Sequence, residues 1–157
     1  MNAEEYQAFY QHSIEDYAND LMKSQDNTME QAVKQAQQEF ADMLPKGRIT
    51  ENNMLMMVEE TDSSRTVGYI WYLYEVCEGA KQVFLNDFLI YEEQRRKGYA
   101  TDALAGMLQN AREDGCMESI TYVWKHNFPG IRLYTKCGYV VFRETEDGMY
   151  MKKEIIR

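Results

Sequence analysis

Residues 82–101 read QVFLNDFLIYEEQRRKGYAT, a strand pattern that runs through a charged turn into a helical pattern. Its first ten residues, 82–91, are apolar at both odd and even positions, which is typical of a strand covered on both faces. A helical pattern begins after Gly98. A strand that feeds a short turn into a helix leaves backbone N–H groups unpaired, with the positive end of the helix dipole behind them. The residues therefore favour either a phosphate or pyrophosphate site or an ordinary solvated turn.

Charge at this turn differs from charge in the rest of the chain. Arg95, Arg96 and Lys97 are three consecutive cations in a protein with 17 Lys and Arg, 26 Asp and Glu, and a formal net charge of -9. The Walker A pattern and the dinucleotide pattern GxGxxG are both missing, which argues against a nucleotide triphosphatase or a hydride-transfer enzyme. The overall acidity also argues against binding to a nucleic-acid backbone.

Hydrophobic periodicity predicts the remaining elements in the order helix, helix, three strands, helix, strand, helix, strand, strand. The expected helices are 3–22, 28–44, 99–114 and 129–136, and the expected strands are 53–60, 66–76, 82–91 and 118–124, followed by a hairpin over 139–155. Thr28 and Gln31 predict a capping box. Asp147-Gly148 predicts a two-residue turn with positive φ. No repeat or long linker interrupts this order, so we expect one mixed α/β domain over 1–157.

Other features of the chain bear on its cellular location and on metal binding. The N-terminus has no basic run before an apolar core, and no apolar stretch approaches 18 residues, so we expect no signal peptide, no membrane span and a cytoplasmic location. The three cysteines are widely spaced and form no CxxC motif, so we expect no metal site.

Two motifs carry a resemblance to a known family. Arg95-x-x-Gly98-x-Ala100, between a strand and a helix, resembles the acetyl-CoA pyrophosphate loop of the GNAT superfamily of N-acetyltransferases. The stretch NFPGIRLYTKCGY at 127–139 is similar to the family's second signature, Asn-x-x-Ala-x-x-Leu-Tyr-x-Lys-x-Gly-Phe/Tyr. The chain departs from the family at Arg96, where many members have glycine, at Gly130, where alanine is commoner, and at its start, where a helical pattern replaces a first strand.

The resemblance covers roughly residues 52–155 and implies the GNAT fold. This α/β (α+β) fold is a mixed, twisted sheet of about six strands flanked by about four helices, and its splayed middle strands form the acetyl-CoA cleft. The implied blocks are an N-terminal helix pair over 1–47, then strands, pyrophosphate loop and third helix over 52–114, then strand, short helix and hairpin over 118–157.

The resemblance also implies a cofactor site for acetyl-CoA as co-substrate, without a metal. The backbone of Phe88, Leu89 and Ile90 would pair with the pantetheine arm, and the side-chain amide of Asn127 would touch it. The pyrophosphate would be held by N–H groups of the loop residues, which are Arg95, Arg96, Lys97, Gly98, Tyr99, Ala100 and Thr101.

The resemblance also implies candidate catalytic residues. Tyr134 would protonate the departing CoA thiolate, and its alternative role is an aromatic of the core. Asp87, with Asn86, interrupts an apolar strand, where burial would raise its pKa toward a value useful for a base. The alternative for Asp87 is a carboxylate satisfied by neighbouring hydroxyl or N–H groups. Tyr74 and Glu75 are the candidate acceptor-site residues.

Two functions from different classes remain at this point. The first is an N-acetyltransferase that moves the acetyl group of acetyl-CoA to a primary amine of a small molecule or peptide, by direct attack in a ternary complex. The second is a non-catalytic acyl-CoA-binding or regulatory module. Neither function predicts a nucleic acid or a membrane as partner, and homodimers are frequent in the family. The carboxylates away from the basic turn favour a cationic acceptor as a hypothesis.

Overall fold

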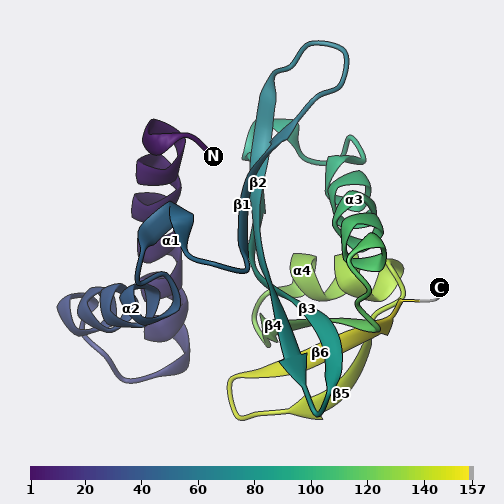
Figure 1. The fold of residues 1–157 in the computed structure, drawn as a ribbon. Helices are drawn as coiled ribbons and strands as arrows, with labels where there is room; N and C mark the ends of the chain where they lie inside the picture. The colour runs from purple at the N-terminus through teal and green to yellow at the C-terminus, as the bar shows by residue number, and fades with distance from the viewer. Residues whose placement is uncertain (156–157) are drawn as a thin grey trace. The chain divides into compact units, whose positions relative to one another are not determined.

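The computed structural model describes residues 1–155, so residues 156 and 157 of the expected 118–157 block lie outside the described part. Contacts within the chain form two units, one from Met1 to Leu55 and the other from Met56 on (Figure 1). The expectation of one domain over 1–157 stays a prediction.

The first unit consists mainly of two helices with matching N-terminal caps. α1 spans Ala3–Ser24 and α2 spans Met29–Met43, followed by a short 3-10 turn at Gly47–Ile49. The predicted capping box is confirmed, because the Thr28 hydroxyl accepts from the Gln31 N–H and the Gln31 side chain accepts from the Thr28 N–H. No helix among residues 1–155 is long and apolar enough to cross a membrane.

Six strands form one mixed sheet in the order β1-β2-β3-β4-β6-β5. Their bounds are β1 Asn53–Glu59, β2 Thr66–Cys77, β3 Ala80–Ile90, β4 Glu118–Trp124, β5 Val140–Glu144 and β6 Gly148–Glu154. β3 and β4 are parallel, whereas β2 pairs with β3, β4 with β6, and β5 with β6 in antiparallel fashion. The predicted mixed sheet of about six strands is confirmed.

Two helices of the second unit flank the site. A short 3-10 turn at Glu92–Gln94 leads from β3 to α3, which spans Tyr99–Glu113 and packs on β2 and β3. α4 spans Phe128–Lys136 and lies between β4 and β5 along the chain (Figure 1). Both the element order and the number of main helices agree with the prediction.

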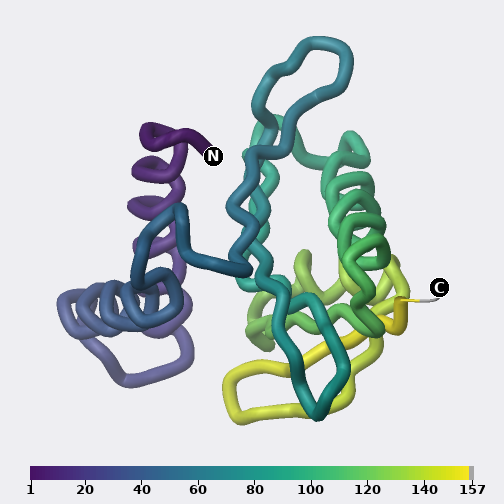
Figure 2. Tube along the Cα trace, viewed as in Figure 1, coloured from purple at the N-terminus to yellow at the C-terminus, as the bar shows by residue number. Residues whose placement is uncertain are grey.

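The two hairpins turn in different ways. β2 returns as β3 through Glu78 and Gly79, whose φ values of 51° and 83° are those of a tight primed turn (Figure 2). The second hairpin is confirmed, but the predicted turn at Asp147-Gly148 is wrong. Gly148 is the first residue of β6, and neither residue has a positive φ. A Cβ on Gly148 would overlap the Tyr122 phenol, so close strand packing explains this glycine.

Candidate functional site

The parallel ladder between β3 and β4 is short, and the two strands separate beyond it. Four residue pairs form the ladder, from Gln82 opposite Glu118 to Leu85 opposite Thr121. β3 then continues to Ile90 paired only with β2, and β4 continues to Trp124 paired only with β6. The backbone of residues 88–90 is therefore not paired with β4, and on this stretch the family resemblance implies that a ligand adds as a strand.

An irregularity in β3 lies where the strands separate. Trp71 pairs with Asp87 and Tyr72 pairs with Leu85, so Asn86 is an extra residue in β3, a β-bulge. The side-chain Nδ2 of Asn86 is buried and has no hydrogen-bond partner. A buried donor without a partner costs about 1–3 kcal/mol, so this amide is a candidate for binding a group that the protein alone does not supply.

Tyr134 lies on α4 and is 8% exposed. Burial raises the pKa of its phenol well above the ordinary value, and the negative charge of Asp87 raises it further. The Tyr134 hydroxyl therefore carries its proton through the neutral range. Because the charge of Asp87 acts on this phenol, the two predicted catalytic residues lie close enough to interact electrostatically.

Thr121 is a member of this group that sequence reasoning missed. Its side chain is 1% exposed, and its Oγ1 donates to the Leu85 carbonyl at 3.1 Å. Thr121 also lowers the pKa of the Tyr134 phenol, against the larger effect of burial. Thr121 and Leu85 are the last pair of the parallel ladder. A threonine in a strand such as ESITYVW is ordinary, so no signal in the sequence singles it out.

The basic turn leads into a helix that no side chain caps. Gly98 is the N-cap of α3, with φ 94°, and makes no side-chain capping bond. The first intrahelical hydrogen bond runs from the Asp102 N–H to the Gly98 carbonyl at 3.1 Å, so the N–H groups of Tyr99, Ala100 and Thr101 precede it. These three donors and the helix dipole suit an anion.

The three cations of the turn differ in their surroundings. The Arg95 N–H donates to the Glu92 carbonyl at 3.2 Å and is thus engaged, while Arg95 Nε donates to the Ile90 carbonyl at 2.9 Å. Lys97 Nζ donates to the Gln94 side chain at 2.9 Å. Arg96 has φ 61°, a conformation that glycine adopts at little cost, which agrees with the glycine that many family members have there.

Tyr99 is held by a partner from another loop. Its hydroxyl donates to Glu60, and Arg65 Nη2 contacts the same carboxylate at 3.2 Å. Hydrogen bonds from Ser63 and Tyr99 lower the pKa of Glu60 to about 2. The loop between β1 and β2 is therefore tied to the first residue of α3, a link that the sequence does not reveal.

Asn127 is the N-cap of α4. Its Oδ1 accepts from the Gly130 N–H at 3.0 Å, and a Cβ on Gly130 would come within 2.8 Å of Asn127 Nδ2. The carbonyl oxygen of this side chain therefore caps the helix. The predicted contact with pantetheine would be made by the side-chain NH2 group.

Tyr74 and Glu75 lie apart from the other predicted residues. They pair with Val83 and Gln82, toward the turn end of the β2–β3 ladder, whereas Phe88 to Ile90 are at its opposite end. Glu75 Oε1 accepts from Gln82 Nε2 at 2.6 Å, and Lys81 lies over the Tyr74 ring, 5.3 Å from its centre. On the ladder, Tyr74 and Glu75 are therefore separated from Asp87, which pairs with Trp71.

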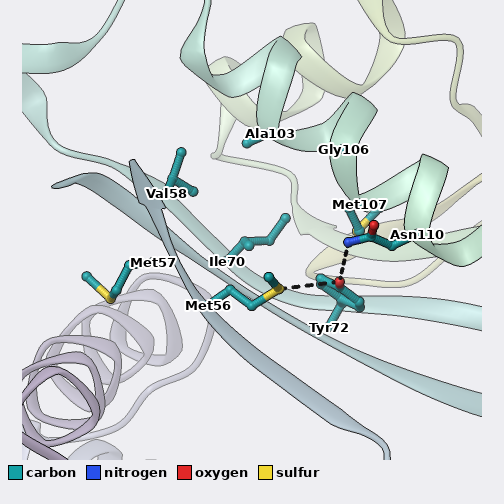
Figure 3. A pocket seen from close by; sticks show the side chains of 9 residues that line it. All are labelled: Met56, Met57, Val58, Ile70, Tyr72, Ala103, Gly106, Met107 and Asn110. Atoms are coloured by element: carbon teal, nitrogen blue, oxygen red, sulfur yellow. Dashed lines mark hydrogen bonds between the residues drawn. The ribbon is translucent and has the colours of Figure 1, made fainter. Parts of the chain in front are cut away.

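A hollow in the same unit is lined by none of the predicted site residues (Figure 3). It has a volume of about 170 Å³ between β1, β2 and α3. Its lining includes the Tyr72 hydroxyl, which donates to Met56 Sδ at 3.5 Å and accepts from Asn110 Nδ2 at 3.3 Å. Its nine lining residues are Met56, Met57, Val58, Ile70, Tyr72, Ala103, Gly106, Met107 and Asn110.

Comparison with known proteins places this geometry in a family. Residues 6–139 match the acetyltransferase (GNAT) family. Two uncharacterized N-acetyltransferases of Bacillus subtilis (strain 168) are similar over nearly their whole length. YdgE is 30% identical over 141 residues, which are 90% of this chain and 89% of that protein. YycN is 32% identical over 152 residues, which are 97% of this chain and 95% of that protein.

Solved structures agree with the sequence matches. The crystal structure of YycN from Bacillus subtilis aligns with this chain at a TM-score of 0.82 and 32% identity. The alignment covers 92% of this chain and 90% of the YycN chain. The PaiA N-acetyltransferase from Thermoplasma acidophilum, in complex with coenzyme A, covers 98% of this chain and 95% of its own, with a TM-score of 0.71 at 14% identity. This second likeness shows the fold alone. From its splayed sheet, its two motifs and these matches, the chain belongs to the GNAT family of acetyltransferases.

Proposed function

We propose that this protein transfers the acetyl group of acetyl-CoA to a primary amine of a small molecule or peptide, by direct attack in a ternary complex. The observation that carries the proposal is the separation of β3 from β4 after Leu85 and Thr121. It leaves an unpaired strand edge for the amide groups of pantetheine, and β3 leads directly to the uncapped N-terminus of α3. A strand edge followed by an anion site matches the order of groups in coenzyme A, with amides on one side of a pyrophosphate.

The residues that would hold acetyl-CoA fit its chemistry. Phe88, Leu89 and Ile90 would offer the backbone groups that β4 leaves unpaired, next to the Ile90 carbonyl that accepts from Arg95 Nε. Gly98 at φ 94° permits close approach of an anion to the loop backbone, and Arg96 and Lys97 add positive charge beside it. The coenzyme A present in the PaiA structure supports the same choice of ligand. When bound, acetyl-CoA supplies an activated acetyl carbon, and the protein positions it.

Two residues would handle the protons of the reaction. An amine acceptor is mostly protonated at neutral pH, and Asp87, directly or through a water, would accept the proton that must leave its nitrogen. The Tyr134 phenol stays protonated because burial raises its pKa, so it has a proton to give to the departing thiolate. The attack, the proton removal and the thiolate protonation all fall at the point where the strands separate.

The acceptor itself is proposed only as a class. The carboxylates that give the chain its net charge of -9 favour a cationic amine over an anionic one. Preferential acetylation of anionic or neutral amines would contradict this part of the proposal without affecting the cofactor site.

Calorimetry with acetyl-CoA, followed by a free-thiol release assay over a panel of amines, tests the proposal. We expect binding, and thiol release with at least one primary amine. Binding without thiol release from any amine would instead favour the non-catalytic acyl-CoA-binding module, and no binding would refute both functions.

Two variants assign the proton-handling roles. Tyr134→Phe should retain acetyl-CoA binding and lose about 100-fold in kcat, since a general acid contributes roughly 10²–10⁴-fold. Asp87→Asn should shift or remove the acid limb of the pH–rate profile. Unchanged turnover in Tyr134→Phe, or an unshifted profile in Asp87→Asn, removes that residue from the mechanism.

A further inference from the structure

The loop between β1 and β2 is folded on itself around Glu60. The Glu60 N–H donates to the Arg65 carbonyl at 2.9 Å, and the Glu60 carbonyl accepts from the Ser64 N–H at 2.9 Å. The Ser63 hydroxyl donates to Glu60 Oε2, whereas Arg65 Nη2 and the Tyr99 hydroxyl both donate to Oε1. The carboxylate is therefore held in one orientation by its own loop, and Tyr99 is its partner from outside that loop.

Strand pairing brings this loop to the start of α3. β2 begins at Thr66, directly after the loop, and its residue Gly68 pairs with Ile90 at the end of β3. The Tyr91 N–H then donates to the Val67 carbonyl at 2.9 Å. Only the turn over 91–98 separates β3 from α3, so the β1–β2 loop and the first turn of α3 lie at the same end of the sheet (Figure 1).

The first turn of α3 needs such a partner to stay in one conformation. Gly98, before it, makes no side-chain capping bond and has φ 94°, and the ends of helices fray. The bond from the Tyr99 hydroxyl joins this turn to a residue 39 positions earlier in the chain. Donors that are fixed before a ligand arrives bind it more tightly, because less conformational entropy is lost on binding.

We propose that the side chains of Glu60 and Tyr99 are positioning residues for acetyl-CoA, and that their bond holds the first turn of α3 in the conformation whose N–H groups bind the pyrophosphate. The inference rests on the proposed function and deepens it, because it extends the cofactor site to a loop that neither family motif contains. Glu60 acts through Tyr99 and touches no part of acetyl-CoA.

The charge of Glu60 separates this role from a simple electrostatic one. A carboxylate near a site for an anion repels the ligand, so by charge alone Glu60→Ala should bind acetyl-CoA more tightly than the wild type. The positioning role predicts the reverse, because the partner of Tyr99 is lost. Glu60→Gln removes the charge but keeps a side-chain oxygen that can accept from the Tyr99 hydroxyl.

The chain offers a matched control in Tyr17. Its hydroxyl donates to Glu39 Oε2, which joins α1 to α2 within the first unit. Tyr17→Phe and Tyr99→Phe therefore each remove one oxygen atom and one bond between a tyrosine and a glutamate. Tyr99→Phe also leaves the backbone N–H of residue 99 in place, so it tests the side chain apart from the predicted backbone contact.

The experiment measures Kd for acetyl-CoA by calorimetric titration, and kcat in the thiol-release assay at saturating acetyl-CoA. Tyr99→Phe and Glu60→Ala should each raise Kd roughly 3- to 10-fold, with kcat within about twofold of the wild type. Glu60→Gln and Tyr17→Phe should each keep Kd within about twofold of the wild-type value. In a Tyr99→Phe background, Glu60→Ala should cause no further loss, because Glu60 acts through the tyrosine.

Several results would overturn the role of this pair: a wild-type Kd in Tyr99→Phe, tighter binding in Glu60→Ala, losses that multiply in the double variant, or an equal loss in Tyr17→Phe. Circular dichroism on each variant verifies folding, and Tyr99→Phe with Tyr17→Phe still decides the question if Glu60→Ala does not fold. A wild-type protein that binds no acetyl-CoA refutes the proposed function, and the role of the pair with it. Wild-type affinity that Tyr99→Phe leaves intact refutes the role of the pair alone.

Discussion

Gly98 offers a sharp test of the pyrophosphate loop through the substitution Gly98→Ala. Gly98 has φ 94°, and a Cβ there would have only Asp102 Oδ2 nearby, at 4.0 Å. The variant therefore has space for its methyl group but a strained backbone, which costs about 1–2 kcal/mol for a residue other than glycine. The reduced freedom of the unfolded chain returns about 0.4–1 kcal/mol, so we expect the free energy of unfolding to fall by roughly 1 kcal/mol.

The effect on acetyl-CoA should be larger than the effect on stability. Relaxation of φ at Gly98 turns the N–H groups that follow it, and a hydrogen bond to a charged group is worth about 1.5–3 kcal/mol. Loss of one such bond raises Kd about 10- to 100-fold, since about 1.4 kcal/mol corresponds to a factor of ten. Calorimetric titration gives Kd, and urea denaturation of the same sample gives the stability.

Gly79→Ala is the matched control for this variant. Gly79 has φ 83° and no atom within 4 Å of an added Cβ, and it lies in the β2–β3 turn at the opposite end of β3. Both variants should lose similar stability, and only Gly98→Ala should lose affinity. An unchanged Kd in Gly98→Ala would refute the reasoning that its backbone holds the pyrophosphate.

Three further variants test the residues around the site. Arg96→Gly should leave the free energy of unfolding unchanged or raise it by up to about 1 kcal/mol in urea denaturation, because Arg96 has φ 61°; a clear loss would contradict this. Asn86→Ala should retain stability within about 1 kcal/mol, since it removes a buried unpaired donor, while kcat/KM falls; an unchanged kcat/KM would show that the amide has no ligand. Glu60 has a lowered pKa of about 2 against an ordinary value of 4.5, so its contribution to stability is present above pH 4.5 and is lost as the pH falls toward 2. The stability difference between wild type and Glu60→Gln should therefore be constant from about pH 8 to 5 and shrink below that range; a difference that shrinks already above pH 5 would argue against the Glu60 bonds.

The fold was predictable because the hydrophobic period and the two motifs agree. Apolar runs covered on both faces and helical spacing place the strands and helices within a few residues, and the Thr28 capping box appears as expected. The turn at Asp147-Gly148 was wrong because glycine has two uses in hairpins, and only the packing of Tyr122 against Gly148 distinguishes them.

The site was predictable where it depends on backbone order and not where it depends on contacts across the fold. The end of β3, Gly98 and the start of α3 are neighbours in sequence, so a local motif describes them. The bond from Thr121 to the Leu85 carbonyl joins residues 36 positions apart, and the link from Glu60 to Tyr99 spans 39 residues. The bulge at Asn86 reflects the register between two strands, which an apolar run does not specify.

The central claim is that acetyl-CoA binds where β3 and β4 separate, and a crystal structure of the complex with acetyl-CoA tests it most directly. The account predicts pantetheine hydrogen-bonded to the backbone of residues 88–90, the pyrophosphate at the N–H groups that follow Gly98, and the thioester sulfur within hydrogen-bond distance of the Tyr134 hydroxyl. Acetyl-CoA bound elsewhere, as in the hollow beside Tyr72, with residues 88–90 free of contacts, would contradict it.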